Sequence, residues 1–196
     1  KIEDAGADSL AIKDMAGLLR PFDAYELVKN LKSTLSIPIH MQTHATTGMS
    51  TATNMKAIEA GIDNTDTSIS SLSMTYGHTA TETMLAIFEN QEREINLDLS
   101  ALEEVSIFFK EIRDKYSEFE GNLKGVDSSM LVKQVPGGML SNLESQLRAN
   151  KQEDKIDLVK DEIPQVRKDF GYPPLVTPAS QIVGAQALLN IMSTRR

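Results

Sequence analysis

Over roughly the first ninety residues, short β-like segments alternate with helical ones, and few folds accommodate that order. The β-like segments span 8–14, 37–44 and 62–69, and each is followed by glycine or small polar residues and then by a helical pattern. Strand–loop–helix units of about 30 residues imply parallel strands joined by right-handed crossovers. We therefore predict an α/β fold. Because three strands cannot close a barrel or cover both faces of a sheet, we also expect further strands upstream of Lys1.

A purely helical pattern replaces this alternation from about residue 96. Apolar residues recur at spacings of three or four from Leu102 to Phe119, which predicts an amphipathic helix. Ser100 and Glu103 have the spacing of a capping box, so this helix is expected to begin at Ser100. Leucines near position 140 predict a second helix.

Two prolines indicate the limits of the later helices. Pro164 follows a helical pattern and should end or kink that helix, because a proline lacks the backbone donor and crowds the preceding turn. Thr177 and Pro178 are expected to be the N-cap and the first position of the last helix. The sequence therefore predicts two regions, an α/β portion over 1–95 and a helical portion over 96–196.

Composition excludes several classes of protein. The chain has 20 Lys and Arg against 28 Asp and Glu, a formal charge of −8, and no basic block, which argues against binding to nucleic-acid phosphates. No apolar run reaches the roughly 18 residues that a membrane span needs. The absence of cysteine excludes disulfides, thiolate metal sites and cysteine nucleophiles, and it fits a reducing, cytoplasmic setting.

Polar residues gather at the carboxyl ends of the first two predicted strands, where parallel α/β folds bind their ligands. Lys13 stands at that end of the first strand, and Gln42 and His44 stand at that end of the second. His40, Gln42 and His44 share one face, with successive members about 7 Å apart. On spacing alone these residues can equally be polar barrel residues satisfied by neighbours, and Lys13 can equally be a structural ion-paired residue.

Five short motifs follow one another along the chain, at Ile12–Pro21, Thr43–Gly48, Asp66–Ser73, Pro136–Asn142 and Tyr172–Gly184. In order and spacing they resemble the carboxyltransferase domain shared by pyruvate carboxylase, the oxaloacetate decarboxylase α subunit and transcarboxylase. The oxaloacetate decarboxylase-like branch looks closest, because Gln181 stands where pyruvate carboxylases usually carry Lys. The resemblance implies that 1–95 is the C-terminal portion of a (β/α)8 TIM barrel, holding its last three strands, and that 96–196 is a helical funnel returning to the barrel mouth.

The resemblance also implies a divalent metal, zinc, manganese or cobalt, at the barrel mouth. The family's carbamylated Lys matches Lys13, and the second histidine of its H-x-H pair matches His44. The first histidine falls on Gln42, whose carboxamide oxygen is harder than an imidazole and uncharged. Gln42 could ligate weakly, the metal could be held more loosely, or the site could be metal-free, and His40 could substitute only after local rearrangement. We expect a retained but weakened metal site.

The catalytic threonine of the family matches Thr177, which would carry a proton between the biotin ureido nitrogen and the pyruvate enol. Ser180 and Gln181 match positions near the biotin pocket. Without the resemblance, all three are ordinary polar residues at a helix start. His78, after the third strand, could line the barrel mouth but is interpreted as a loop residue.

The resemblance implies reversible transfer of a carboxyl group between oxaloacetate or pyruvate and biotin, through a metal-stabilised enolate. Biotin would arrive on a separate carrier protein or domain, since no Ala-Met-Lys-Met biotinylation motif is present. The family's first-strand Asp ligand and substrate-gripping residues would lie upstream, so we expect this fragment alone to be inactive. The resemblance leads us to expect a homodimer, since relatives dimerise. The lack of cysteine and the negative charge lead us to expect a cytoplasmic protein that binds no nucleic acid, and association with membrane decarboxylase subunits stays open.

Two alternatives stay open beside this one. A degenerate or non-catalytic subunit could use the funnel only to dock a biotin carrier, and the glutamine at position 42 favours that interpretation. A metal-dependent aldol-type lyase or synthase, of the 3-hydroxy-3-methylglutaryl-CoA lyase kind, shares the H-x-H strand but lacks the funnel and the Val176–Ser180 stretch. The direction of carboxyl transfer is not decided by the residues.

Overall fold

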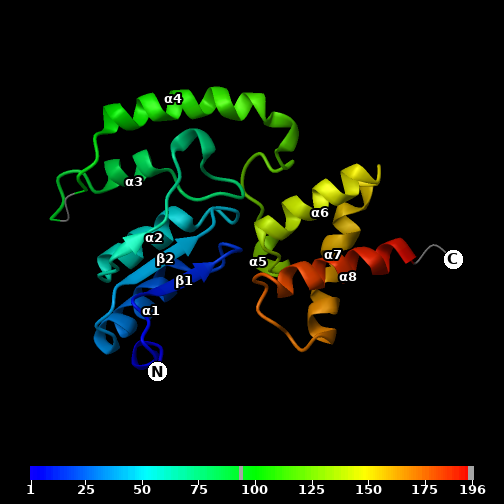
Figure 1. Ribbon diagram of the computed structural model, residues 1–196, viewed down its shortest axis with the longest axis horizontal. Coiled ribbons are helices and arrows are strands. Elements are labelled where there is room, and N and C mark those ends of the chain that lie inside the picture. Colours follow the sequence, from blue (N-terminus) through cyan, green and yellow to red (C-terminus); the bar gives the residue numbers. More distant parts are fainter. Residues whose placement is uncertain (93–94, 194–196) are drawn as a thin grey trace.

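The structure, a computed structural model, describes residues 1–92 and 95–193. Within those residues the strands form one small sheet, and the helices divide between the neighbourhood of that sheet and a separate helical group (Figure 1). The strands are β1 (Leu10–Asp14), β2 (Ile39–Thr43) and β3 (Asn64–Thr65). The helices are α1 (Pro21–Thr34), α2 (Ser50–Glu59), α3 (Thr81–Ile87), α4 (Leu99–Lys115), α5 (Met130–Lys133), α6 (Gly137–Ala149), α7 (Ile156–Asp169) and α8 (Ala179–Ser193).

The three strands lie side by side in chain order and are parallel, so the predicted α/β class is confirmed. Alternate side chains of a strand point to opposite faces. One face packs against α1 and α2, and its buried side chains form a compact apolar cluster of Val28, Ile39, Met41, Ala57 and Ile62. The opposite face carries Lys13, His40 and Gln42, which remain accessible. The helices therefore hold the sheet from one side and leave the polar face open.

The third strand is much shorter than the predicted segment 62–69. After β3 the chain leaves β2, because Ser68 finds other backbone partners. The amide of Ser68 donates to the carbonyl of Thr79 at 2.9 Å, and its carbonyl accepts from the amide of Thr81 at 2.8 Å. Competition from this later segment, which local pattern does not reveal, ends the strand early.

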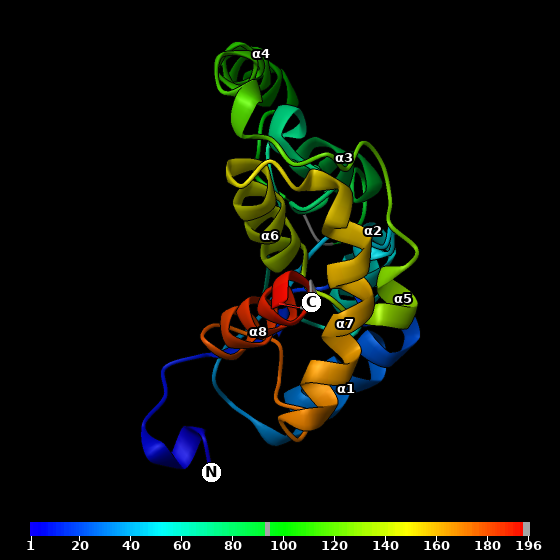
Figure 2. The same ribbon diagram turned by 90° about the vertical axis from the view of Figure 1, so that its right-hand side faces the viewer.

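The helical group α5–α8 has a core of its own. Helix α8 packs against α6 and α7, and Figure 2 shows these three helices grouped on one side of the molecule. Gly184 of α8 allows the close approach, since a Cβ there would lie 2.9 Å from Met139 Cε. The buried side chains shared by the group include Met130, Val135, Leu140, Leu143, Leu147, Val159, Ile163, Val166 and Val183.

The N-cap predicted for one helix is wrong, and Pro164 does not end another. Helix α4, which runs along α3 at the edge of the molecule (Figure 1), is capped by Asp98, not by Ser100. The Asp98 carboxylate accepts from the amides of Ser100 and Ala101 at 2.8 and 3.3 Å. Helix α7 continues through Pro164 to Asp169, because burial of its apolar face in the helical core compensates for the missing backbone donor.

The start of α8 also differs from the prediction. A cis peptide bond joins Thr177 to Pro178, and the helix begins at Ala179, so Pro178 precedes the first turn instead of occupying it. The carbonyl of Pro178 accepts the first helical bonds, from the amides of Gln181 and Ile182 at 3.0 and 3.2 Å.

Two leucines of the helical group differ in how deeply they are buried. Leu140 of α6 is 0% exposed, whereas Leu158 of α7 is 55% exposed. We expect Leu140→Ala to lower the free energy of unfolding by about 2–5 kcal/mol, because it removes buried apolar contacts and leaves a cavity. Leu158→Ala, the matched control, should change it by no more than about 0.5 kcal/mol. Urea unfolding of the two variants measures both values, and equal losses would contradict the assigned core.

Candidate functional site

The carboxyl ends of β1 and β2 bring Lys13, Gln42 and His44 together. Lys13 pairs with Gln42 in the parallel register, on the open face of the sheet. His44 follows the last residue of β2, and the Lys13 charge is close enough to act on its imidazole. In the part of the chain that the structure describes, Lys13 forms no ion pair, so its amine is available for chemistry. We call these three residues, together with His78, the sheet-edge cluster.

Asp14, next to Lys13, is fully engaged in local structure. Its carboxylate accepts from the amides of Leu18 and Leu19, each at 2.9 Å, and from the Thr43 hydroxyl at 2.8 Å. Its carbonyl accepts from the His44 amide at 3.0 Å. Asp14 therefore joins the loop after β1 to the end of β2 and holds Lys13 and His44 at a constant separation.

The hydrogen bond of His44 determines which ring nitrogen is free. Its Nδ1 lies 2.6 Å from the carbonyl oxygen of Tyr76. A carbonyl can only accept, so Nδ1 carries the proton and Nε2 keeps its lone pair. Burial lowers the pKa of His44, against the opposing effect of the Tyr76 carbonyl, so the ring is neutral at neutral pH. A neutral imidazole with a backbone-bound Nδ1–H is the form that ligates metals.

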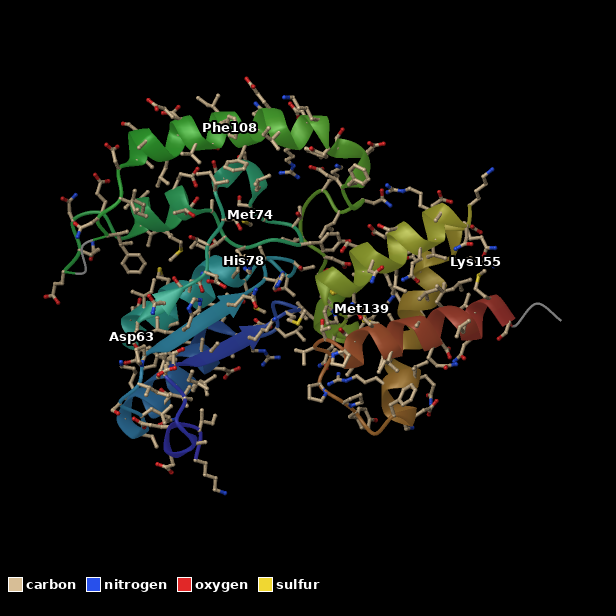
Figure 3. All side chains as sticks on the ribbon, in the orientation of Figure 1. Asp63, Met74, His78, Phe108, Met139 and Lys155 are labelled. Carbon is tan, nitrogen blue, oxygen red and sulfur yellow. The ribbon has the colours of Figure 1, made fainter. Side chains whose placement is uncertain are left out.

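His78, which the sequence pattern left as a loop residue, lies against His44. The two ring centroids are 4.7 Å apart, with the planes tilted by 48°. His78 Nδ1 is 3.0 Å from the carbonyl oxygen of Thr43, which can only accept, so this Nδ1 also carries a proton. In Figure 3 His78 lies beside the tip of β2, at the other end of the sheet from Asp63. No local periodicity could have revealed this contact, because it joins two loops.

Thr177, Ser180 and Gln181 line one pocket of about 380 Å³ between α6 and α8. Ser180 is buried, and Thr177 and Gln181 are exposed at the rim. We call this the α6–α8 pocket. The side chains that complete it are Met15, Met139, Asn142, Leu143, Gln146 and Ala185.

The α6–α8 pocket and the sheet-edge cluster adjoin but do not merge. Lys13 lines a second hollow of about 200 Å³, together with Arg167 and Val176. Met15 lines both hollows, and Val176 of the second is the chain neighbour of Thr177 in the first. The structure thus brings Lys13 and Thr177 to two neighbouring cavities that share a wall.

The α6–α8 pocket and the sheet-edge cluster offer different chemistry, and of the cluster only Lys13 lines the second hollow. The α6–α8 pocket offers hydroxyl and carboxamide groups above an apolar floor, which suits a neutral, planar, amide-like ligand. The sheet-edge cluster offers an amine, a carboxamide oxygen and two imidazole nitrogens. With CO2 bound to the amine, that set suits a divalent cation. Among the described residues no group of three His, Cys, Asp or Glu side chains could hold a metal by itself.

Two family models match the chain. Residues 1–108 match the family described as HMGL-like, and residues 130–196 match the conserved carboxylase domain. The chain is 51% identical to the methylmalonyl-CoA carboxyltransferase 5S subunit of Propionibacterium freudenreichii subsp. shermanii, over 96% of this chain and 38% of that protein. It is 48% identical to a pyruvate carboxylase subunit of Methanocaldococcus jannaschii, over 100% of this chain and 35% of that protein.

Comparison with solved structures points to the same family as the sequence matches. The carboxyl transferase domain of Rhizobium etli pyruvate carboxylase with pyruvate and biocytin matches with a TM-score of 0.92 and 35% identity, over 97% of this chain and 32% of that chain. This chain therefore spans about a third of the length of these relatives. The expected barrel portion with a helical extension is confirmed, as is the resemblance carried by the five motifs. The chain belongs to the HMGL-like family, and it carries the conserved carboxylase domain over residues 130–196.

Proposed function

We propose that this chain forms part of a biotin-dependent carboxyltransferase that moves a carboxyl group between oxaloacetate or pyruvate and biotin. The observation that carries the proposal is the contiguity of two chemically different cavities, one lined by Lys13 and the other by Thr177, with Met15 as their common wall. Such a pair can hold an anionic keto acid and a neutral ureido ring side by side. The Rhizobium etli domain that carries pyruvate and biocytin has the same fold over this chain.

Lys13, His44 and Gln42 would hold the divalent cation, zinc, manganese or cobalt. His44 fits because its Nε2 lone pair is free, and Lys13 fits because, in the part of the chain that the structure describes, its amine forms no ion pair. An ammonium has no lone pair, so Lys13 must first react with CO2 to present a carbamate oxygen. Gln42, opposite Lys13, adds a neutral oxygen. The cation would supply a Lewis acid that lowers the free energy of the pyruvate enolate.

Thr177 would move the proton, because a hydroxyl can accept one proton while it donates another. Its position at the rim of the α6–α8 pocket leaves it open to both ligands. Ser180 and Gln181 would orient the ureido ring, together with the carboxamides of Asn142 and Gln146. Biotin, when bound, would carry the carboxyl group on a ureido nitrogen.

Biotin would be presented by a separate carrier domain or subunit. We propose a homodimer in the cytoplasm, without nucleic acid, and with membrane decarboxylase subunits as possible further partners. Across the described residues, no helix has both the length and the apolar character needed to cross a membrane.

The alternatives differ in what supports them. The match of 130–196 to the conserved carboxylase domain disfavours a lyase without a funnel. Gln42 still favours a subunit that only docks a biotin carrier, and the experiments below separate that function from catalysis.

Lys13→Arg tests the carbamate. Arginine keeps the positive charge but stays protonated and cannot react with CO2. We expect the complete wild-type enzyme to bind zinc more tightly when bicarbonate is added, and Lys13→Arg to lose that bicarbonate dependence. The zinc content of both proteins after dialysis, measured by inductively coupled plasma mass spectrometry, tests both expectations. Equal zinc content in the two proteins at every bicarbonate concentration would rule out Lys13 as a ligand.

Gln42→His tests whether the side chain at position 42 is a metal ligand. An imidazole at this position is a better zinc donor than a carboxamide oxygen, so the affinity of the complete enzyme for zinc should rise by at least about tenfold. Competition with a chromogenic chelator measures it. Gln146→His, on α6 in the neighbouring pocket, is the control and should leave the affinity unchanged. No gain from Gln42→His would mean that position 42 does not face the metal.

Thr177→Ala tests the proton transfer. We expect avidin-sensitive carboxyl exchange by the complete enzyme to fall by about 10²–10⁴-fold, because general acid–base catalysis contributes about that much. Thr177→Ser keeps the hydroxyl and should retain most of the exchange, and Thr34→Ala on α1 should change nothing. Full exchange by Thr177→Ala would refute the role of Thr177. Absence of exchange in the wild type, with carrier binding intact, would favour the docking subunit.

A further inference from the structure

The loop from Ser73 to His78, between the sheet and α3, has a strained backbone. Met74 and Thr75 both have left-handed backbones, with φ of 63° and 49°. Side chains disfavour this region, and a β-branched residue such as Thr75 disfavours it most. Gly77 is also constrained, since a Cβ there would lie 3.2 Å from the carbonyl oxygens of Leu72 and Met74. Such a loop keeps its shape only where its surroundings hold it.

The side chain of Tyr76 provides that support. A Cβ on Gly121 would lie 2.6 Å from Tyr76 Cε2, and a Cβ on Gly137 would lie 2.8 Å from Tyr76 Cδ1. Both glycines therefore contact the ring directly, at its two edges, and both belong to the helical portion. We call Gly121, Gly137 and Glu144 the Tyr76 socket.

Glu144 of α6 completes the Tyr76 socket. The Tyr76 hydroxyl donates to Glu144 Oε1 at 3.2 Å, and the other carboxylate oxygen accepts from the amide of Asn122 at 3.1 Å. Glu144 is only 8% exposed, so its carboxylate needs both of these donors. Burial, and then the charge of Glu144, raise the pKa of Tyr76, so the phenol stays protonated and keeps donating.

The backbone of the same residue reaches the sheet-edge cluster. The Tyr76 carbonyl accepts from His44 Nδ1 at 2.6 Å, and the next carbonyl, of Gly77, accepts from the amide of Ala45 at 2.8 Å. Tyr76 thus contacts α6 with its side chain and His44 with its main chain. Helix α6 also lines the α6–α8 pocket through Asn142 and Gln146, so one helix contacts both that pocket and Tyr76.

We infer that Tyr76 is a positioning residue, which sets the orientation and proton position of the His44 ring from its socket in the helical region. The inference rests on the proposed role of His44 as a metal ligand. While the Tyr76 side chain occupies its socket, the Tyr76 carbonyl accepts from Nδ1 of His44 and leaves Nε2 of His44 free for a cation. When the Tyr76 side chain loses its contacts with the Tyr76 socket, the strained loop relaxes and the His44 proton is no longer held on Nδ1.

The experiment uses two variants of different severity in the complete enzyme. Tyr76→Phe removes only the hydroxyl that binds Glu144. Gly137→Ala inserts a methyl group into the Tyr76 socket, 2.8 Å from the ring. Tyr116→Phe is the control, because Tyr116 lines the same hollow as Tyr76 but is 60% exposed, and among the described residues its hydroxyl forms no hydrogen bond. Melting temperatures establish that each variant is folded.

The first readout is the tautomer of His44 in the metal-free protein, from ¹⁵N chemical shifts of the ring. We expect a single Nδ1–H form in the wild type and in Tyr116→Phe, and an increased Nε2–H population in Tyr76→Phe and Gly137→Ala. The second readout is zinc affinity, which should fall by about tenfold in both variants, as when a group orienting a ligand is lost.

The outcomes separate this inference from the proposed function. The tautomer is measured without metal, biotin or turnover, so a wild type that fails to exchange carboxyl groups refutes the function and leaves this test intact. If folded Tyr76→Phe and Gly137→Ala keep the wild-type tautomer and zinc affinity while the wild type exchanges normally, Tyr76 has no positioning role.

Discussion

The parallel pairing of β1 with β2 is the contact on which the rest of the site depends. That register sets Lys13 opposite Gln42, and it brings the two strand ends to one edge, where the Asp14 carboxylate bonds both the loop after β1 and Thr43. A slip of one residue would turn Lys13 toward α1 and α2 and place apolar side chains on the open face. The buried cluster around Met41 opposes such a slip, so packing on one face of the sheet maintains the chemistry on the other.

The helical group lies beside that edge of the sheet and contacts it through α6. Helix α6 presents Asn142 and Gln146 to the α6–α8 pocket, and it presents Glu144 to Tyr76. The apolar face of α6 is buried in the core that it shares with α7 and α8. The proposed carboxyl transfer would need such a connection, because the donor and the acceptor of the carboxyl group must be held near each other while water is excluded.

Prediction from sequence succeeded for the main helices and strands. It failed where a distant segment intervened, and also at the N-cap of α4, where Asp98 takes the place expected of Ser100. The parallel strands and the helical second half follow from periodicity, and the family follows from short ordered motifs. The third strand was predicted too long because Ser68 pairs with Thr79 and Thr81. Pro164 was expected to end or kink a helix, and tertiary burial sustains that helix as far as Asp169. The roles assigned to Thr177 and to the metal ligands stay predictions, because residue identity does not reveal what a cavity binds.

Residue types and their order were thus sufficient for the α/β class, for the family, and for a short list of candidate ligands at the ends of two strands. The proton position on His44, the contact between His44 and His78, and the seating of Tyr76 between two glycines arise only in the folded chain. Each joins residues that are more than thirty positions apart. Contacts of that range follow no helical or strand period, so they exist only after the sheet and the helical group have packed together.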